Sequence, residues 1–187
     1  MVNIVERLTI LFIVIALILI GCKEDLSNNE GSSSIETRST AQTMPENMPK
    51  DFGFSVSFGF GKKNEINTFK DTVTKDLIED GTKTVDIALT DEEMLEIYEK
   101  MKEIDITNTK QFIPEPVNGE MCEQEPYEED EWKITLDGET ISHYISGAYC
   151  EPTKDARQFL ELRNFVFNKI ENKDEYLKLP KSKGGYE

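Results

Sequence analysis

Few residues of this sequence have the type and spacing that a chemical reaction requires. The 187 residues include one histidine, His143, which excludes a zinc site built from several histidines. The HExxH, CxxC and GxSxG patterns of metalloproteases, redox proteins and serine hydrolases are absent. Gly61-Lys62 lacks the upstream glycine of a phosphate-binding loop, because Val56 stands there. We therefore assign no catalytic residue.

His143 lies on the same face of a predicted strand as Ile145, and we interpret it as a partly buried residue that packs on Trp132. A lone titratable side chain without a partner is weak support for a site. The alternative is a hydrolase or transferase that uses carboxylates near His143. It would require a pocket that joins His143 to Asp137 or Glu139.

Residues 114–132 are unusually acidic, with eight Asp or Glu residues and no Lys or Arg. Clustered carboxylates suit calcium, although the spacing of an EF-hand is absent. The candidate metal ligands are Glu123, Glu125, Glu128, Glu129, Asp130 and Glu131. A run of charge is more often a solvated surface. A weak calcium site and a surface for a basic partner remain as alternatives.

The whole chain is acidic as well, with a formal net charge of −16 and a pI near 4.5. Binding to nucleic acid needs clustered Lys and Arg, so we expect no nucleic-acid partner. The length allows one domain.

The N-terminus reads as an export signal. Residues 8–20, LTILFIVIALILI, are too few to span a membrane unaided, and they end at Leu19-Ile20-Gly21-Cys22. This pattern resembles the signal of bacterial lipoproteins. The resemblance implies cleavage between Gly21 and Cys22 and a diacylglycerol with palmitate-type chains on Cys22. Two such chains hold a protein stably at a membrane. The resemblance therefore implies that the protein is anchored at the outer, extracytoplasmic face of the cell membrane. The alternative is a signal anchor or a buried helix in which Cys22 is only a small apolar residue.

We accordingly divide the chain into a signal peptide (1–21), a lipidated cysteine with a flexible tether (22–50) and one folded domain (51–187). The tether has few apolar residues and no periodicity, so it cannot offset the entropy of ordering.

With Cys22 lipidated, Cys122 and Cys150 remain in an exported domain, and we predict that they form a disulfide. The bond would clamp the base of the hairpin between them. The rival interpretation is a Cys-His nucleophile with His143, but nothing in the sequence activates either thiol.

Alternating residues predict the strands. Phe52 to Phe60 alternate large and small side chains, and further strands are expected at about 70–78 and 84–89. A three-residue loop with Gly81 in the left-handed conformation would set Val73 opposite Ile87. In the segment WKITLDGETISHYI, the turn at Asp137-Gly138 predicts a hairpin that pairs Ile134 with Ile141 and Trp132 with His143.

Two helices complete the prediction. Thr90 and Glu93 form a capping box before the apolar stripe Met94, Ile97, Tyr98, Met101 and Ile104. The second helix runs from about Thr153 to Glu171, with buried residues Ala156, Phe159, Leu160, Val166, Phe167 and Ile170. A short turn at 174–179 and a loose tail follow. The predicted fold is α+β: an antiparallel sheet of about five strands, two main helices on one face and a disulfide-clamped hairpin.

The segments NEINTFKDTVTKDLI, LTDEEMLEIYEKMKEIDI and YLKLPKSKGGY resemble uncharacterised small lipoproteins of Gram-positive bacteria. The resemblance implies an extracytoplasmic address but no activity or ligand. Three hypotheses remain. The first is a lipid-anchored binding or interaction module, with a protein partner in the envelope and no cofactor. The second is a hydrolase or transferase that uses carboxylates near His143, and the third is a structural module that binds calcium weakly. We favour the first.

Overall fold

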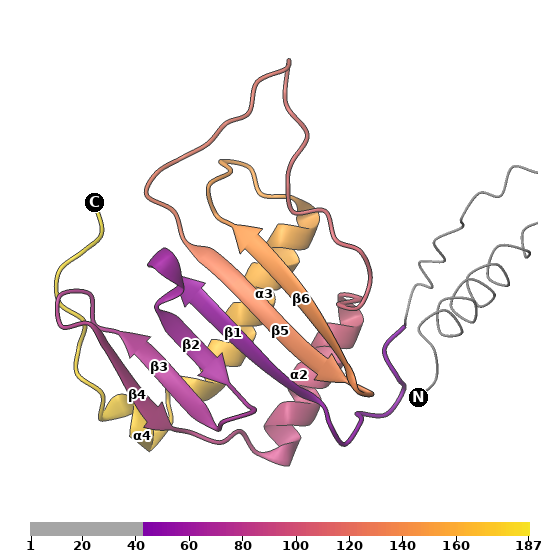
Figure 1. The fold of residues 1–187 in the computed structure, drawn as a ribbon, viewed down its shortest axis with the longest axis vertical. Helices are drawn as coiled ribbons and strands as arrows, with labels where there is room; N and C mark the ends of the chain where they lie inside the picture. The colour runs from indigo at the N-terminus through magenta and orange to yellow at the C-terminus, as the bar shows by residue number, and fades with distance from the viewer. Residues whose placement is uncertain (1–42) are drawn as a thin grey trace, which may run out of the picture. The chain divides into compact units, whose positions relative to one another are not determined.

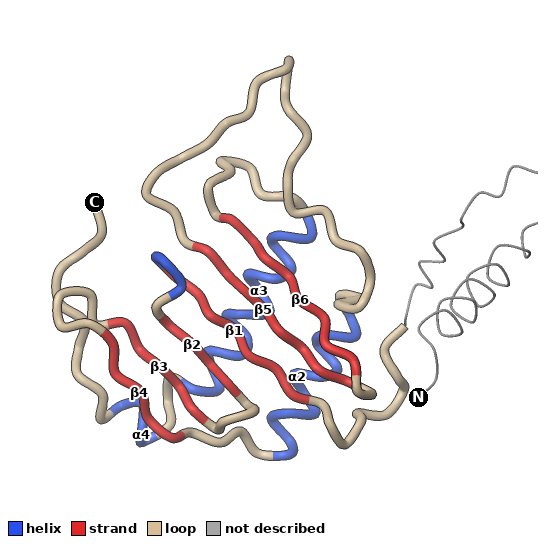
Figure 2. The backbone as a smooth tube through the Cα atoms, viewed as in Figure 1, coloured by secondary structure: helices blue, strands red, loops and turns tan. Residues whose placement is uncertain are grey.

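Six strands form an antiparallel sheet in residues 43–187, the part of the chain that the computed structural model describes (Figures 1 and 2). The order across the sheet is β4-β3-β2-β1-β5-β6. The strands are β1 (Gly53–Gly59), β2 (Asn64–Asn67), β3 (Thr72–Asp76), β4 (Thr82–Asp86), β5 (Glu129–Leu136) and β6 (Glu139–Ser146). The helices are α2 (Asp91–Glu103), α3 (Lys154–Ile170) and the short α4 (Asp174–Leu177), and a 3-10 turn, η1 (Phe60–Lys62), follows β1.

The α+β class is confirmed, but the predicted number of strands, about five, is wrong. The additional strand is β2, which pairs with both β1 and β3. Its four residues contain a single aliphatic side chain, Ile66, so they show no alternation. The pairing of β2 depends on its two neighbours in the sheet, which a local pattern does not report.

The two faces of the sheet differ in character. One row across the strands is Val85, Val73, Ile66, Val56, Trp132 and His143. The adjacent row, on the opposite face, is Thr84, Thr74, Glu65, Ser57, Glu131 and Tyr144. Helices α2 and α3 lie on the first face (Figure 1) and bury it, with Trp132 against Phe54 and Phe159 at the centre.

The β5–β6 hairpin has the predicted register, with Ile134 opposite Ile141 and Trp132 opposite His143. Asp137 and Gly138 both have positive φ, 50° and 77°, as the predicted two-residue turn requires. The Asp51 carboxylate accepts hydrogen bonds from both turn amides at 3.0 and 2.6 Å. The hydrogen bond from Gly138 is the main reason that the pKa of Asp51 is lowered.

The register predicted for β3 and β4 is wrong, because Val73 pairs with Val85 and not with Ile87. The amide of Leu77 donates to the carbonyl of Gly81 at 2.8 Å, which places the loop at residues 78–80. Ile78 has a φ of 64°, which is unusual for a β-branched residue. The C-terminal tail holds this loop through a bridge between Ile78 and Lys183, a contact that no local rule anticipates.

Both long helices begin as predicted. The capping box of Thr90 and Glu93 is formed at the start of α2, and Thr153 caps α3 through its hydroxyl. The predicted buried face of α3 is partly wrong, because Leu160 is 41% exposed whereas Leu162 is fully buried. The stripe of α3 advances from Phe159 to Leu162 and then to Val166, so Leu160 falls on its edge.

The folded unit begins before residue 51, which differs from the predicted boundary. Met44 is buried in the core, and the hydroxyl of Tyr98 donates to the carbonyl of Pro45 at 2.7 Å. The segment 43–50 therefore packs on α2 and does not belong to the tether.

The C-terminal tail was predicted to be loose, and this is wrong, because it is attached to the domain. Tyr186 stacks on Phe60 with ring centroids 4.6 Å apart, and its hydroxyl donates to Asp76.

The predicted lipidation and cleavage positions, Cys22 and Gly21, lie outside the described residues, as does most of the predicted tether. Within residues 43–187, no helix is long and apolar enough to cross a membrane.

Candidate functional site

The disulfide between Cys122 and Cys150 is present, as predicted, with 5.5 Å between the Cα atoms. It extends the hairpin beyond the ends of β5 and β6. The amide of Cys150 donates to the carbonyl of Cys122 at 3.1 Å, and the amide of Gln124 donates to the carbonyl of Ala148 at 2.7 Å. We call residues 122–128 and 147–150 the strap, because these two segments are tied together by the disulfide and by backbone hydrogen bonds.

A cavity of about 330 Å³ lies between the strap and α3. Its walls are mainly apolar and come from η1, β5, β6, the strap, the short loop before α3 and α3 itself. They include Phe60, Ile145, Tyr149, Pro152, Ala156 and Leu160. Its charged lining residues are Glu128, Asp130, Arg157 and Arg163.

A buried ion pair forms one side of the cavity. One nitrogen of Arg163, Nη1, lies 3.0 Å from Asp130 Oδ1 and 2.9 Å from Glu128 Oε2. Asp130 is only 6% exposed, and burial raises its pKa to about 6, although the nearby Arg163 opposes that increase. The guanidinium of Arg163 also lies 5.4 Å from the centre of the Phe58 ring. This pair is a fixed part of the cavity wall.

The six acids predicted as metal ligands do not converge. Successive residues of a strand point to opposite faces, so Asp130 faces the helices whereas Glu129 and Glu131 lie on the opposite face. Glu131 pairs with Lys62 at 2.9 Å, and Glu129 accepts a hydrogen bond from Tyr144. This bond is the main reason that the pKa of Tyr144 rises to about 12.

Glu123 and Glu125 lie on the exposed strap and form no ion pair within residues 43–187. In the same range, no three His, Cys, Asp or Glu side chains are grouped closely enough to hold a metal ion. The calcium hypothesis stays a prediction that this geometry does not favour.

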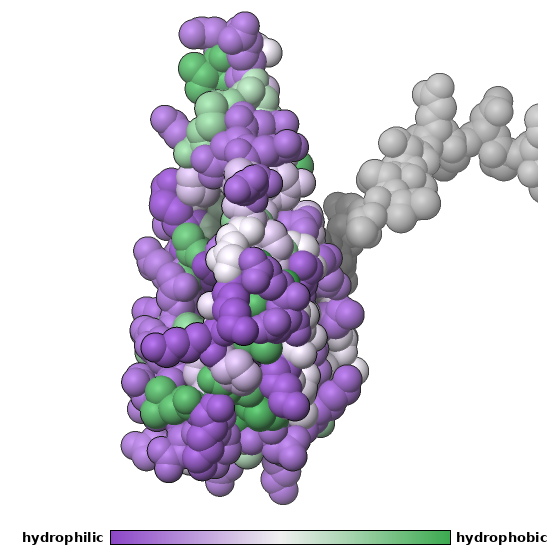
Figure 3. Space-filling view, turned by 90° about the vertical axis from the view of Figure 1, so that its left-hand side faces the viewer, coloured by the Kyte–Doolittle hydropathy of each residue, from purple (hydrophilic) through white to green (hydrophobic). Residues whose placement is uncertain are grey.

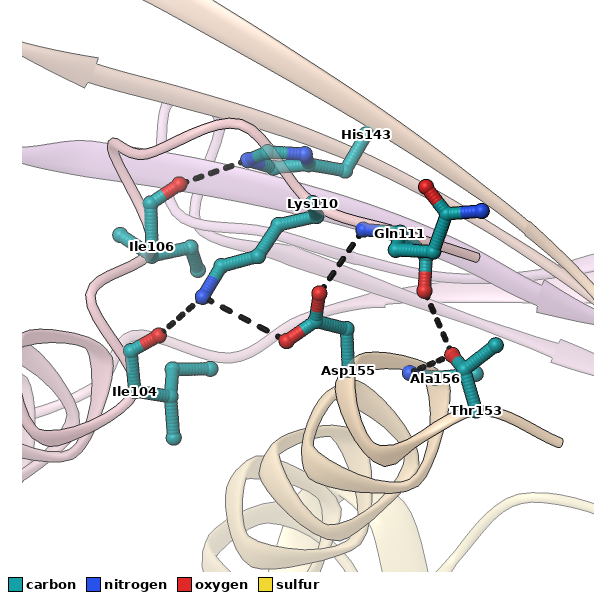
Figure 4. Close-up of polar contacts among 8 residues, drawn as sticks. All are labelled: Ile104, Ile106, Lys110, Gln111, His143, Thr153, Asp155 and Ala156. Atoms are coloured by element: carbon teal, nitrogen blue, oxygen red, sulfur yellow. Dashed lines mark hydrogen bonds and ion pairs between the residues drawn. The ribbon is translucent and has the colours of Figure 1, made fainter. Parts of the chain in front are cut away.

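His143 holds neighbouring segments together (Figure 4). Its Nε2 lies 2.7 Å from the carbonyl of Ile106, and its ring packs edge-on against Phe112 and Phe159 at 5.8 and 4.8 Å. Burial lowers the pKa of His143. Although Trp132 is its cross-strand partner, the ring contacts are made with Phe112 and Phe159.

The segment after Ile106 is fixed to α3 by a second set of contacts (Figure 4). Asp155 accepts a hydrogen bond from the amide of Gln111 at 2.8 Å and lies 3.8 Å from the ammonium of Lys110. The hydroxyl of Thr153 donates to the carbonyl of Gln111 at 2.6 Å. Most of these contacts join a side chain to a backbone group of a neighbouring segment, so the cluster around His143 serves to hold these segments together.

The acids proposed as partners of His143 lie elsewhere. Asp137 is in the hairpin turn, and Glu139 pairs with Leu136, four positions along the strand from His143. At about 3.3 Å per residue this separates the Cα atoms of Glu139 and His143 by roughly 13 Å. His143, Asp137 and Glu139 do not line the cavity beside the disulfide or the three other prominent hollows of the described residues.

The segment before the strap projects from the domain (Figure 1). Apolar side chains of this segment are exposed to solvent. Val117 is 70% exposed and Ile113 is 56% exposed. Figure 3 shows hydrophobic and hydrophilic side chains mixed at this end of the molecule. We call residues 113–121 the arm. Its acids Glu115 and Glu120 form no ion pair within the described part of the chain.

Comparison with known protein families, with curated protein sequences and with solved structures found no match.

Sequence reasoning missed the cavity and its arginines. One signal was available, because Asp130 has the same strand parity as Trp132 and Ile134 and must therefore face the core. A buried carboxylate needs a cation, and Arg163 lies on the helix that covers that face. The participation of Leu160 and of the strap could not be predicted, because it depends on how α3 crosses the sheet.

Proposed function

We propose that the protein is a lipid-anchored module that binds a partner at the outer face of the cell membrane. The sequence Leu19-Ile20-Gly21-Cys22 supports the anchor, and the disulfide supports an oxidising compartment outside the cytoplasm. The net charge of −16 would repel an anionic membrane surface, so the lipid on Cys22 provides the attachment.

The observation that carries the proposal is the cavity beside the disulfide. It is open, mainly apolar and of the size that binding pockets have, about 300 to 1,000 Å³. Its walls are fixed by the disulfide, by the Asp130–Arg163 pair and by α3. A rigid apolar hollow at the surface is the usual form of a binding site.

The enzyme alternative has less support. It requires a concave site at which His143 meets Asp137 or Glu139, whereas these residues are separated along the hairpin and His143 contacts a backbone carbonyl. A catalytic base must reach the proton that it removes.

The anchor is tested by metabolic labelling of cells with a palmitate analogue, followed by fractionation. We expect label on the wild-type protein in the membrane fraction and none on the Cys22→Ala variant. An unlabelled wild-type protein, or equal labelling of the variant, would show that Cys22 is not lipidated.

The binding function is tested in the same cells by cross-linking and mass spectrometry of the co-purified proteins. We expect a specific partner that is recovered with the wild-type protein and is depleted when Cys22 is replaced. Recovery of the same background proteins from both strains would contradict the proposal.

A further inference from the structure

We propose that the cavity beside the disulfide binds a basic segment of a partner protein, which inserts one large apolar side chain and places flanking lysines or arginines against the carboxylates of the strap. This inference rests on the proposed binding function and names the chemistry of its partner.

The cavity walls offer a surface on which a large apolar side chain can pack. Ile145, Ala156 and Leu160 present aliphatic surface from β6 and α3. Leu160 is 41% exposed on α3, between the buried residues Phe159 and Leu162, so its side chain is available to a ligand. A volume of about 330 Å³ is at the lower end for ligand pockets, about 300 to 1,000 Å³, and suits one large side chain better than an extended molecule.

The carboxylates that would contact the basic residues line a second hollow, which continues the cavity. The two share Gln124, Tyr127, Ser146 and Tyr149, and the second is also lined by Glu123 and Glu125. Both carboxylates are exposed and form no ion pair within the described chain. They are therefore free to meet cations.

The two arginines of the cavity do not cancel the negative charge of the two hollows. Arg163 is occupied by two carboxylates, and the guanidinium of Arg157 donates to the carbonyl of Pro152. The two hollows together carry four carboxylates and two guanidinium groups, which gives a formal charge of −2. The arm adds Glu115 and Glu120 nearby in the sequence, and the whole chain carries −16. A basic partner is favoured by the local charge and by the long-range field.

The test uses the full chain in phosphatidylcholine nanodiscs, whose lipid carries no net charge. The probe is a fluorescent peptide with one tryptophan between two pairs of lysines, and the reference peptide has serine in place of tryptophan. Binding is measured by anisotropy at low and at physiological salt. We expect the tryptophan peptide to bind about fivefold more tightly or better, and both affinities to fall with salt.

Two matched pairs of variants locate the site. Leu160→Ser should weaken binding of the tryptophan peptide about fivefold, whereas Leu95→Ser, which changes a similarly exposed leucine on α2, should not. The double variant Glu123→Gln, Glu125→Gln should lower the affinity for the tryptophan peptide about five- to tenfold at low salt. The control double variant Asp86→Asn, Glu175→Gln removes the same charge at exposed positions on β4 and α4 and should change this affinity less than about twofold.

Equal losses in the test and control variants would show general attraction to an acidic protein and would overturn the proposal. So would equal affinities of the two peptides, or no binding of either. These outcomes leave the anchor and the cross-linked partner of the preceding section intact, so the two proposals can fail separately. Circular-dichroism melting of each variant verifies that it is folded.

Discussion

The buried carboxylate of Asp130 gives the sharpest test of the structure. Asp130 is 6% exposed, and burial raises its pKa from the ordinary 3.8 to about 6 in spite of Arg163. The fold therefore favours the protonated form of Asp130. Its contribution to stability is complete below about pH 3.8 and disappears as the pH rises through about 6.

The size of the effect follows from the same values. The difference between 3.8 and about 6 corresponds to about 3 kcal/mol, at about 1.4 kcal/mol per pH unit. Asn cannot ionise but keeps the shape of the carboxyl group. The free energy of unfolding of Asp130→Asn, relative to that of the wild type, should therefore rise by about 2 to 3 kcal/mol between pH 4 and pH 8.

The assay is urea unfolding of both proteins at a series of pH values, with the difference in unfolding free energy plotted against pH. Glu131→Gln is the matched control, because the neighbouring Lys62 lowers the pKa of Glu131 and its difference should run in the opposite direction. A difference for Asp130→Asn that is constant with pH, or that falls as the pH rises, would refute the argument from burial.

Three further predictions concern the elements around the cavity. Replacing both Cys122 and Cys150 by Ser should lower the free energy of unfolding by about 3 to 4 kcal/mol, measured in urea, and a reductant should affect only the wild type. Leu162→Ala should cost about 2 to 5 kcal/mol whereas Leu160→Ala should cost less than about 1, and comparable costs would contradict the orientation of α3. His143 should titrate below 6.5 by NMR, because its partial burial disfavours the charged form of the ring. Its contribution to stability should then be lost as the pH falls through the pKa of the folded state, and a value of 6.5 or above would contradict its placement.

Local rules predicted the elements that are stabilised locally. The capping box of α2, the turn at Asp137-Gly138 and the register of β5 with β6 depend on residues close in sequence, and all three are present. The disulfide could be predicted from the number of cysteines once the chain was taken to be exported.

The elements that sequence reasoning missed depend on distant contacts. Strand β2 is formed by its neighbours in the sheet, and the loop at Ile78 is held by Lys183, over a hundred residues later. Met44 was assigned to a tether because its segment has no periodicity, yet it is buried in the core.

The same holds for the candidate site. The acidic run could be recognised in the sequence, but which of its carboxylates are buried, paired or exposed could not, because that depends on the face of the sheet on which each residue lies. The cavity could not be predicted either, because it depends on how α3 crosses β6 and the strap.

The order of the sheet has a consequence for how the chain folds. Strands β1 to β4 pair in succession, and β5 pairs with β6, so each set is joined by short connections. Only the ladder between β1 and β5 joins the two sets within residues 43–187, and it pairs Phe54 with Ile134, 80 residues later. Closing that ladder has the largest entropic cost of any strand pairing here, so it should limit the folding rate. Until β5 arrives, one edge of β1 is unpaired, and a chain that emerges N-terminus first exposes an apolar strand edge that invites aggregation.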